Sequence, residues 1–273
     1  RCPKPPARAR SVARPCAKMP PFENRDTTGG KFGMSTAKIQ FFSEGLGKWT
    51  SYNVILPDDG DGPFPVLLQL HGLSDDADAW LQRSNLVRHV AGLPLVVVLP
   101  DGGTSGYVNW KASDRLHKNR YEDLLVQDIP AHLQRTFNVT DGPWAIGGLS
   151  MGGYGAMRLG LKYPDRFNSI YAHSSAFHIH EVLDQDLVDT SIADADVFHL
   201  AEALAGRDDL PAIAFDCGTE DRLIDTNRRF HEHLQTLNIG HHYAEFPGDH
   251  DWDYWDEHVV EALALHARVL ELR

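Results

Sequence analysis

The stretch "WAIGGLSMGGYGAM", Trp144 to Met157, places four glycines within three residues of Ser150. An apolar, strand-like run ends at Gly148 and a helical pattern begins near Met151, so Ser150 falls at a strand-to-helix corner. Such a sharp corner holds its serine in a strained conformation, and side chains two residues before and after it would collide. Glycine at 148 and 152 removes both collisions. The stretch therefore predicts a tight corner that exposes the Ser150 hydroxyl.

The helix that begins at this corner carries two further glycines, Gly153 and Gly155, which we expect to let it lie close against neighbouring strands. Its N-terminus also directs a positive dipole at the serine hydroxyl, which favours a nucleophile there. The bare G-x-S-x-G pattern is weak evidence, because Gly and Ser are common. The strand before it, the helix after it and the extra glycines favour a nucleophile elbow over a chance pentapeptide.

Outward from this corner, apolar runs alternate with amphipathic stretches. The expected strands are 38–43, 50–56, 64–70, 94–100, 144–148, 169–174, 212–218 and 241–247, and the expected helical stretches are 77–91, 120–136, 151–163, 225–237 and 253–272. The central strands are continuously apolar, as parallel strands covered on both faces are. The first two have no helix between them, which predicts an antiparallel N-terminal pair. The pattern predicts an α/β fold with a mostly parallel central sheet and helices on both faces.

The length of 273 residues favours one domain, here 34–273, preceded by a tail at 1–33. The tail is rich in Pro and Arg, so we expect it to be disordered and to derive from vector or upstream sequence, with a natural start at Met34. The alternative is an arm for nucleic acid or membrane. Within the domain, 177–206 is acidic with short helical fragments, which fits either a small cap over a pocket or a solvated connection.

Charge and composition limit the partners. Outside the tail the chain has 18 basic and 36 acidic residues, which disfavours nucleic acid as a partner. The sequence contains no apolar run long enough to span a membrane. Only Cys217 lies outside the tail, which fits a reducing cytoplasm. We expect a small-molecule substrate, and the sequence is compatible with a homo-oligomer.

A serine hydroxyl is a poor nucleophile at neutral pH, so it needs a base and a carboxylate that orients the base. In folds with such an elbow these follow in the order serine, acid, histidine. Asp221 lies just beyond the strand at 212–218, with Glu220 as its local competitor. His250 is the histidine that follows the next strand in a loop. The other nearby carboxyls are Asp216, inside the strand, and Asp225.

Two backbone N–H groups are needed to stabilise the charge that develops on the substrate oxygen. One should belong to Met151, directly after the serine, and the other to Leu73, in the loop after the strand at 64–70. His71 in that loop is more readily explained as a structural residue. Tyr107 and Trp110, in the loop after 94–100, either line a substrate pocket or pack in the core.

These blocks together resemble the esterase D-like branch of the α/β-hydrolases, which includes tributyrin-type carboxylesterases, S-formylglutathione hydrolases, feruloyl and acetylxylan esterases, and mycolyltransferases. The resemblance covers the chain from about Ala37 to its end. It rests on "LQLHGLSDD" (68–76), "NRYEDLLVQDIPAHL" (119–133), "IGGLSMGGYGAMRLGLKYPDRF" (146–167), "DCGTEDRLI" (216–224) and "FPGDHDWDYW" (246–255). It implies Ser150 as nucleophile, Asp221 as orienting acid, His250 as base, and Leu73 and Met151 as oxyanion donors.

The expected function is hydrolysis of short-chain acyl esters through a Ser-His-Asp triad and an acyl-enzyme, without a metal or cofactor. The short-chain preference rests on the absence of a long apolar lid in the sequence. The alternatives are an S-formylglutathione hydrolase and a feruloyl or acetylxylan esterase. From other classes come a sugar acyltransferase and a non-catalytic carbohydrate-binding protein of the same fold.

Overall fold

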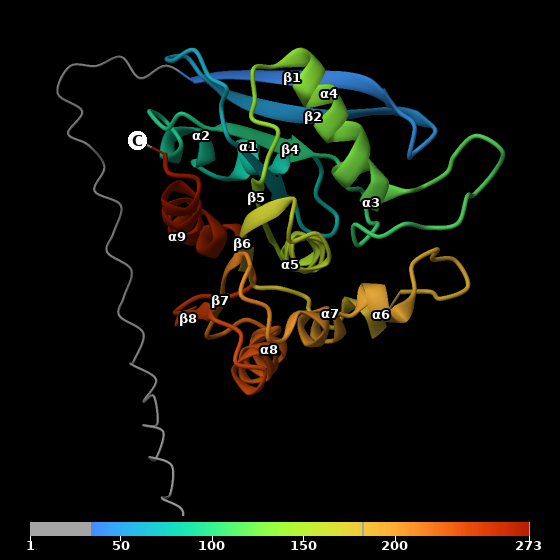
Figure 1. Cartoon of the computed structure of the whole chain (residues 1–273), viewed down its shortest axis with the longest axis vertical. Coiled ribbons are helices and arrows are strands. Elements are labelled where there is room, and N and C mark those ends of the chain that lie inside the picture. The colour runs from blue at the N-terminus through green and yellow to red at the C-terminus, as the bar shows by residue number, and fades with distance from the viewer. Residues whose placement is uncertain (1–33, 182, 273) are drawn as a thin grey trace, which may run out of the picture.

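The computed structural model describes residues 34–181 and 183–272, so the expectations for residues 1–33 lie outside the described residues. An eight-stranded sheet runs through it in the order β1-β2-β4-β3-β5-β6-β7-β8 (Figure 1). The strands are β1 (Met34–Ser43), β2 (Lys48–Pro57), β3 (Val66–Leu70), β4 (Val96–Pro100), β5 (Trp144–Leu149), β6 (Phe167–His173), β7 (Ala212–Gly218) and β8 (His241–Phe246). All eight coincide with predicted strands to within a few residues.

The pairing of the strands confirms the predicted fold. β1 pairs antiparallel with β2, and β2 pairs antiparallel with β4. From β4 through β3 to β8 every neighbouring pair is parallel. β3, β4 and β5 are buried along their whole length, which is why their sequences are apolar without alternation.

Helices cover both faces of the sheet, and each face has its own apolar core (Figure 1). The main helices are α1 (Ala79–Arg83), α2 (Leu86–His89), α4 (Ile129–Thr136), α5 (Met151–Lys162), α8 (Ile224–Thr236) and α9 (Trp252–Val269). α1, α2 and α9 pack on one face, whereas α4, α5 and α8 pack on the other. No helix within the described ranges is long and apolar enough to cross a membrane.

Two helical stretches differ from the prediction in detail. The stretch 77–91 is divided into α1 and α2, because the Ser84 hydroxyl bonds the Trp80 carbonyl and Asn85 bonds Asp256 in α9. Short polar side chains of this kind compete with helical hydrogen bonds. The stretch 120–136 contains α3 (Tyr121–Asp123) and a π-helical turn, η1 (Leu124–Asp128), ahead of α4. Pro130 near the start of α4 has no N–H for a regular helical bond.

The segment 177–206 follows β6 and holds η2 (Ile179–Glu181), α6 (Ile192–Ala195) and α7 (Val197–Leu204). It is attached to the loop after β4 by a bridge between Trp110 and Val188, and by hydrogen bonds between Asn109 and Thr190. The segment is thus helical, as expected, and packs beside that loop. Its role as a cap stays a prediction.

Candidate active site

Ser150 sits at the corner between β5 and α5 with φ of 52° and ψ of −114°, a backbone conformation rare for a residue with a side chain. Hydrogen bonds hold this conformation: the Ser150 N–H donates to the His173 carbonyl, and its own carbonyl accepts from the Tyr154 and Ala176 N–H groups. The backbone is therefore fixed from both sides. The hydroxyl projects from a corner that cannot relax locally.

The glycines around the corner are needed for close backbone approach. A Cβ at Gly148 would lie 2.5 Å from the Gly152 carbonyl oxygen, which is the collision expected from the sequence. Gly153 lies against the end of β6, also as expected. At Gly155 the nearest atoms belong instead to the side chain of Tyr107, in the loop after β4.

Gly152→Ala should destabilise the protein by about 1–3 kcal/mol and lower any activity of Ser150. The new Cβ would lie 2.5 Å from the Leu70 carbonyl oxygen and 2.6 Å from that of His71, and backbone at the end of β3 cannot move aside cheaply. Gly240→Ala is the matched control, since a Cβ there meets no atom within 4 Å. Chemical denaturation should show a change within about 0.5 kcal/mol for the control. Equal stability of the two variants would contradict the steric argument.

The structure brings three predicted residues together although they are far apart in the chain. His250 Nε2 lies 3.0 Å from Ser150 Oγ, and His250 Nδ1 lies 2.8 Å from Asp221 Oδ2. Both contacts are within hydrogen-bond reach, with the imidazole between the hydroxyl and the carboxylate. The residues follow β5, β7 and β8, whose carboxyl ends lie on the same edge of the sheet.

The surroundings of Asp221 keep its carboxyl ionised. Burial by itself raises the pKa, but the hydrogen bonds from His250 and from the Leu223 N–H outweigh burial and hold the pKa of Asp221 below its usual range. The Leu223 N–H donates to Asp221 Oδ1 at 2.7 Å, which leaves Oδ2 for the imidazole. The imidazole therefore carries its proton on Nδ1 and presents Nε2 to the Ser150 hydroxyl as an acceptor.

The competing carboxyls have other partners. Glu220 is exposed and accepts a hydrogen bond from the Gly248 N–H. Asp216 is buried and accepts hydrogen bonds from Tyr171, Tyr254 and His173. Asp249, directly before His250, accepts from the His250 backbone N–H and faces solvent. Of these carboxyls, Asp221 is the one in contact with the His250 ring.

The predicted oxyanion donors lie at the start of helix α5 and in the loop after β3. Met151 is the first residue of α5, where an N–H has no acceptor within its own helix. Leu73 follows β3, and its N–H has no hydrogen-bond acceptor among the described residues. A Cβ on the neighbouring Gly72 would lie 3.8 Å from the Ser150 Cβ, so this loop is close to the hydroxyl. The role of Met151 and Leu73 as oxyanion donors stays a prediction.

The His71 ring bonds two loop backbones: Nε2 accepts from the Gly102 N–H at 2.9 Å, and Nδ1 donates to the Gly72 carbonyl at 2.8 Å. The ring of Trp255 is a contact that sequence reasoning missed. It stands perpendicular to the His250 imidazole at a centroid distance of 5.0 Å. Trp255 is buried, and no local sequence pattern pairs it with His250.

The two predicted pocket residues, Tyr107 and Trp110, differ in their surroundings. Trp110 lines a cavity of about 370 Å³ together with Thr104, Ser105, Tyr121 and Leu187. Tyr107 is completely buried, and its ring packs against Gly102 and Gly155. In this structure it is therefore a core residue beneath the loop after β4 and not an exposed pocket wall.

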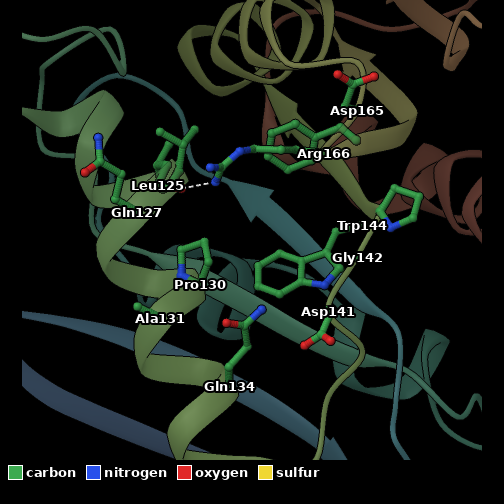
Figure 2. Close-up of a pocket in the computed structure, with 13 residues that line it drawn as sticks. Leu125, Gln127, Pro130, Ala131, Gln134, Asp141, Gly142, Trp144, Asp165 and Arg166 are labelled. Atoms are coloured by element: carbon green, nitrogen blue, oxygen red, sulfur yellow. Dashed lines mark hydrogen bonds between the residues drawn. The ribbon is translucent and has the colours of Figure 1, made fainter.

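A larger cavity, of about 600 Å³, lies elsewhere (Figure 2). It is bordered by Trp144 and Phe167 at the amino ends of β5 and β6, whereas Ser150 follows the carboxyl end of β5. The larger of these two cavities therefore does not lie at Ser150. Within the described residues, no group of three or more His, Cys, Asp or Glu side chains is arranged to hold a metal ion.

A mostly parallel sheet in which one strand turns through a glycine-flanked serine into a helix defines the α/β-hydrolases. The chain belongs to the Esterase family, whose model, described as "Putative esterase", matches residues 43–266. Within it, the protein falls in the esterase D-like branch and is a carboxylic ester hydrolase of the serine type.

The chain is similar to an acetyl esterase of Caldicellulosiruptor saccharolyticus, with 29% identity over 86% of this chain and 99% of the relative. Among solved structures it resembles the Staphylococcus aureus fluorophosphonate-binding serine hydrolase FphF, with 25% identity, a TM-score of 0.73, and coverage of 84% of this chain and 97% of the other. An S-formylglutathione hydrolase of Agrobacterium tumefaciens shares the fold at 22% identity and a TM-score of 0.78, with coverage of 88% and 97%.

Proposed function

We propose that this esterase hydrolyses short-chain acyl esters at Ser150, with His250 as base and Asp221 as the carboxylate that orients it. The observation that carries the proposal is the pair of contacts on the His250 ring, 3.0 Å to Ser150 Oγ and 2.8 Å to Asp221 Oδ2. The name of the acetyl esterase that the chain resembles over 86% of its length supports a small acyl group.

The proposed reaction has two halves. Ser150 Oγ attacks the ester carbonyl while His250 Nε2 takes the hydroxyl proton, and the N–H groups of Leu73 and Met151 stabilise the oxyanion. The imidazolium then gives its proton to the leaving alcohol, which departs and leaves an acyl group on Ser150. A water molecule, activated by the same imidazole, releases the acid and restores the serine.

The first test is reaction with a fluorophosphonate, which phosphonylates activated serine hydroxyls. We expect one adduct per chain, on the peptide that contains Ser150, as judged by mass spectrometry after proteolysis. The activated hydroxyl is the reason, because an ordinary serine does not react at neutral pH. Labelling of a different serine, or of none, would contradict the assignment.

The substrate class is tested with p-nitrophenyl acetate, butyrate and octanoate beside S-formylglutathione and methyl ferulate. We expect the highest kcat/KM for acetate or butyrate and a fall at octanoate. A rate with S-formylglutathione that clearly exceeds those of the simple esters would favour the thioesterase instead. In that case the proposed acyl-enzyme chemistry would stand and the short-chain ester preference would not.

A further inference from the structure

We propose that Tyr107 is a positioning residue for the oxyanion hole: its buried hydroxyl holds the loop that presents the Leu73 N–H to the substrate. This inference rests on the proposed function, since it concerns the proposed oxyanion donor. The Tyr107 hydroxyl donates to the His71 carbonyl at 2.9 Å, two residues before Leu73. Tyr107 therefore acts through the loop backbone and does not contact the substrate.

The Tyr107 ring has one position available to it. A Cβ at Gly102 would lie 2.2 Å from the ring, and a Cβ at Gly155 would lie 2.5 Å from it, so the ring is held between the loop after β4 and helix α5. The His71 ring also accepts a hydrogen bond from the Gly102 N–H. The loop that carries Leu73 is thus attached at two points to the loop that carries Tyr107.

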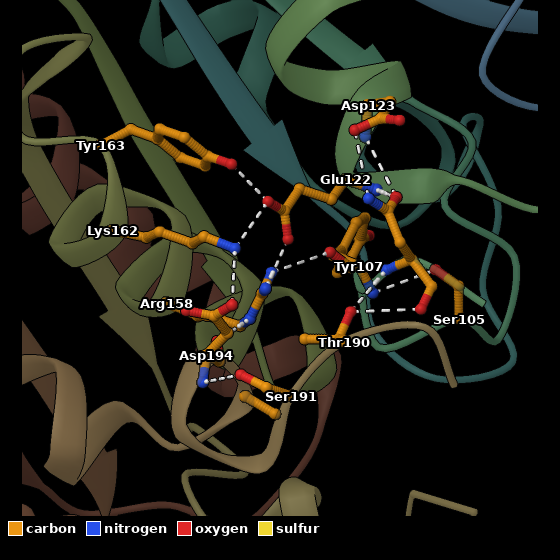
Figure 3. Close-up of polar contacts among 12 residues, drawn as sticks. Ser105, Tyr107, Glu122, Asp123, Arg158, Lys162, Tyr163, Thr190, Ser191 and Asp194 are labelled. Atoms are coloured by element: carbon orange, nitrogen blue, oxygen red, sulfur yellow. Dashed lines mark hydrogen bonds and ion pairs between the residues drawn. The ribbon is translucent and has the colours of Figure 1, made fainter. Parts of the chain in front are cut away.

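The backbone of Tyr107 is fixed by a buried arginine. Tyr107 has φ of 57°, which is rare for a bulky side chain and needs support from its surroundings. Arg158 Nη1 donates to the Tyr107 carbonyl at 3.3 Å, and the Tyr107 N–H donates to Ser105 Oγ at 3.0 Å. Figure 3 shows Arg158 between Tyr107, Glu122 and Asp194.

Arg158 is itself firmly placed. It is completely buried, pairs with the Glu122 carboxylate, and donates through Nε to the Asp194 carbonyl at 2.7 Å. Burial by itself raises the pKa of Glu122, but the Arg158 charge and hydrogen bonds from Tyr163 and Arg158 outweigh it, so the pKa lies below its usual range. The ion pair keeps the arginine fixed on α5.

Helix α5 therefore positions both Ser150 and the loop that carries Leu73. Its first turn follows Ser150, and two turns later Arg158 fixes Tyr107, whose hydroxyl fixes the loop of Leu73. Loss of a complete oxyanion donor costs roughly a hundred- to thousandfold in kcat. Loss of the hydrogen bond that positions a donor should cost less, about ten- to a hundredfold.

The experiment compares Tyr107→Phe with Tyr154→Phe. Tyr154 on α5 is a matched control, because it is also completely buried and donates its hydroxyl to a backbone carbonyl, that of Ala195, at 2.6 Å. The substitution to phenylalanine removes only this hydroxyl and keeps the Tyr154 backbone N–H that bonds the Ser150 carbonyl. Both variants should lower Tm by similar amounts. Only Tyr107→Phe should lower kcat for p-nitrophenyl acetate, by about ten- to a hundredfold with KM nearly unchanged.

A trifluoromethyl ketone gives a second readout, since its serine adduct carries an oxyanion. Tyr107→Phe should weaken the inhibitor by the same factor as kcat/KM, while Tyr154→Phe leaves it unchanged. An unchanged kcat in Tyr107→Phe, or equal losses in the two variants, would overturn the inference while leaving the proposed function intact. A wild-type protein without any ester hydrolysis would instead refute the proposed function, and this inference with it.

Discussion

Ser150→Ala is expected to lower kcat for p-nitrophenyl acetate by about a million-fold, to the background rate. The variant removes the oxygen that hydrogen-bonds His250 Nε2, so neither attack nor acyl-enzyme formation is available. The fold should persist, because alanine and serine tolerate the strained corner equally and the backbone bonds of residue 150 remain. Initial rates, fluorophosphonate labelling and Tm measured on the same preparation check all three statements.

Ser175→Ala is the matched control for that experiment. Ser175 is also buried and close to α5, but its hydroxyl makes a single long hydrogen bond within the described part of the chain, to the His173 carbonyl at 3.5 Å. This variant should keep its rate within a few-fold of wild type and should still be labelled at Ser150. A Ser150→Ala protein that hydrolyses esters above background would remove the basis of the proposed reaction.

Asp221→Asn is expected to lower kcat by about ten thousandfold while leaving the geometry intact. The Leu223 N–H donates to Oδ1, so the asparagine must place its carbonyl oxygen there and turn its NH₂ group toward His250. An amide donor facing Nδ1 moves the imidazole proton to Nε2, which then cannot accept the proton of Ser150. The loss of kcat thus follows from the changed tautomer of His250. A crystal structure of the variant should show the His250 ring in its wild-type position.

Asp249→Asn separates this effect from a general loss of negative charge. Its carboxylate is exposed and bonds only the His250 backbone N–H, so we expect a loss of less than about tenfold, the value of one hydrogen bond. Equal losses in the two variants would show that charge near the imidazole matters more than its tautomer.

The same carboxylate links folding to pH. Because the pKa of Asp221 is lowered on folding, its ionised form contributes stability fully above the ordinary value of 3.8. That contribution is lost as the pH falls through the lower folded value. Asp221→Asn should therefore unfold with a weaker dependence on pH in this acidic range, as measured by denaturation at a series of pH values.

Much of the fold could be predicted because the signals are local and strong. Continuous apolar runs identified the central strands, and Gly148 and Gly152 identified the corner, since a side chain at either position would collide with backbone atoms. The break between α1 and α2 was missed, because it depends on the bond between Asn85 and Asp256. A contact across 171 residues leaves no periodicity to read.

For the site, too, local sequence signals were sufficient for some residues and not for others. Chain order and position after a strand pointed to Asp221 and His250, whose contacts with one another and with Ser150 the structure now gives. The environment of Tyr107 could not be predicted, because an aromatic residue in a loop is equally consistent with a pocket wall and with the core. Its burial depends on Gly102 and Gly155, and only three-dimensional packing relates these glycines to it.

Ser150, Asp221 and His250 follow β5, β7 and β8, so their contacts depend on the pairing of distant parts of the chain. The hydroxyl is positioned by β5 and α5, whereas its partner imidazole follows β8, the last strand in the sequence. Pairings between residues so distant in the chain are slow to form. If the proposed function holds, a chain in which β8 has not yet paired with β7 carries an inert alcohol at Ser150, and ester cleavage requires that pairing.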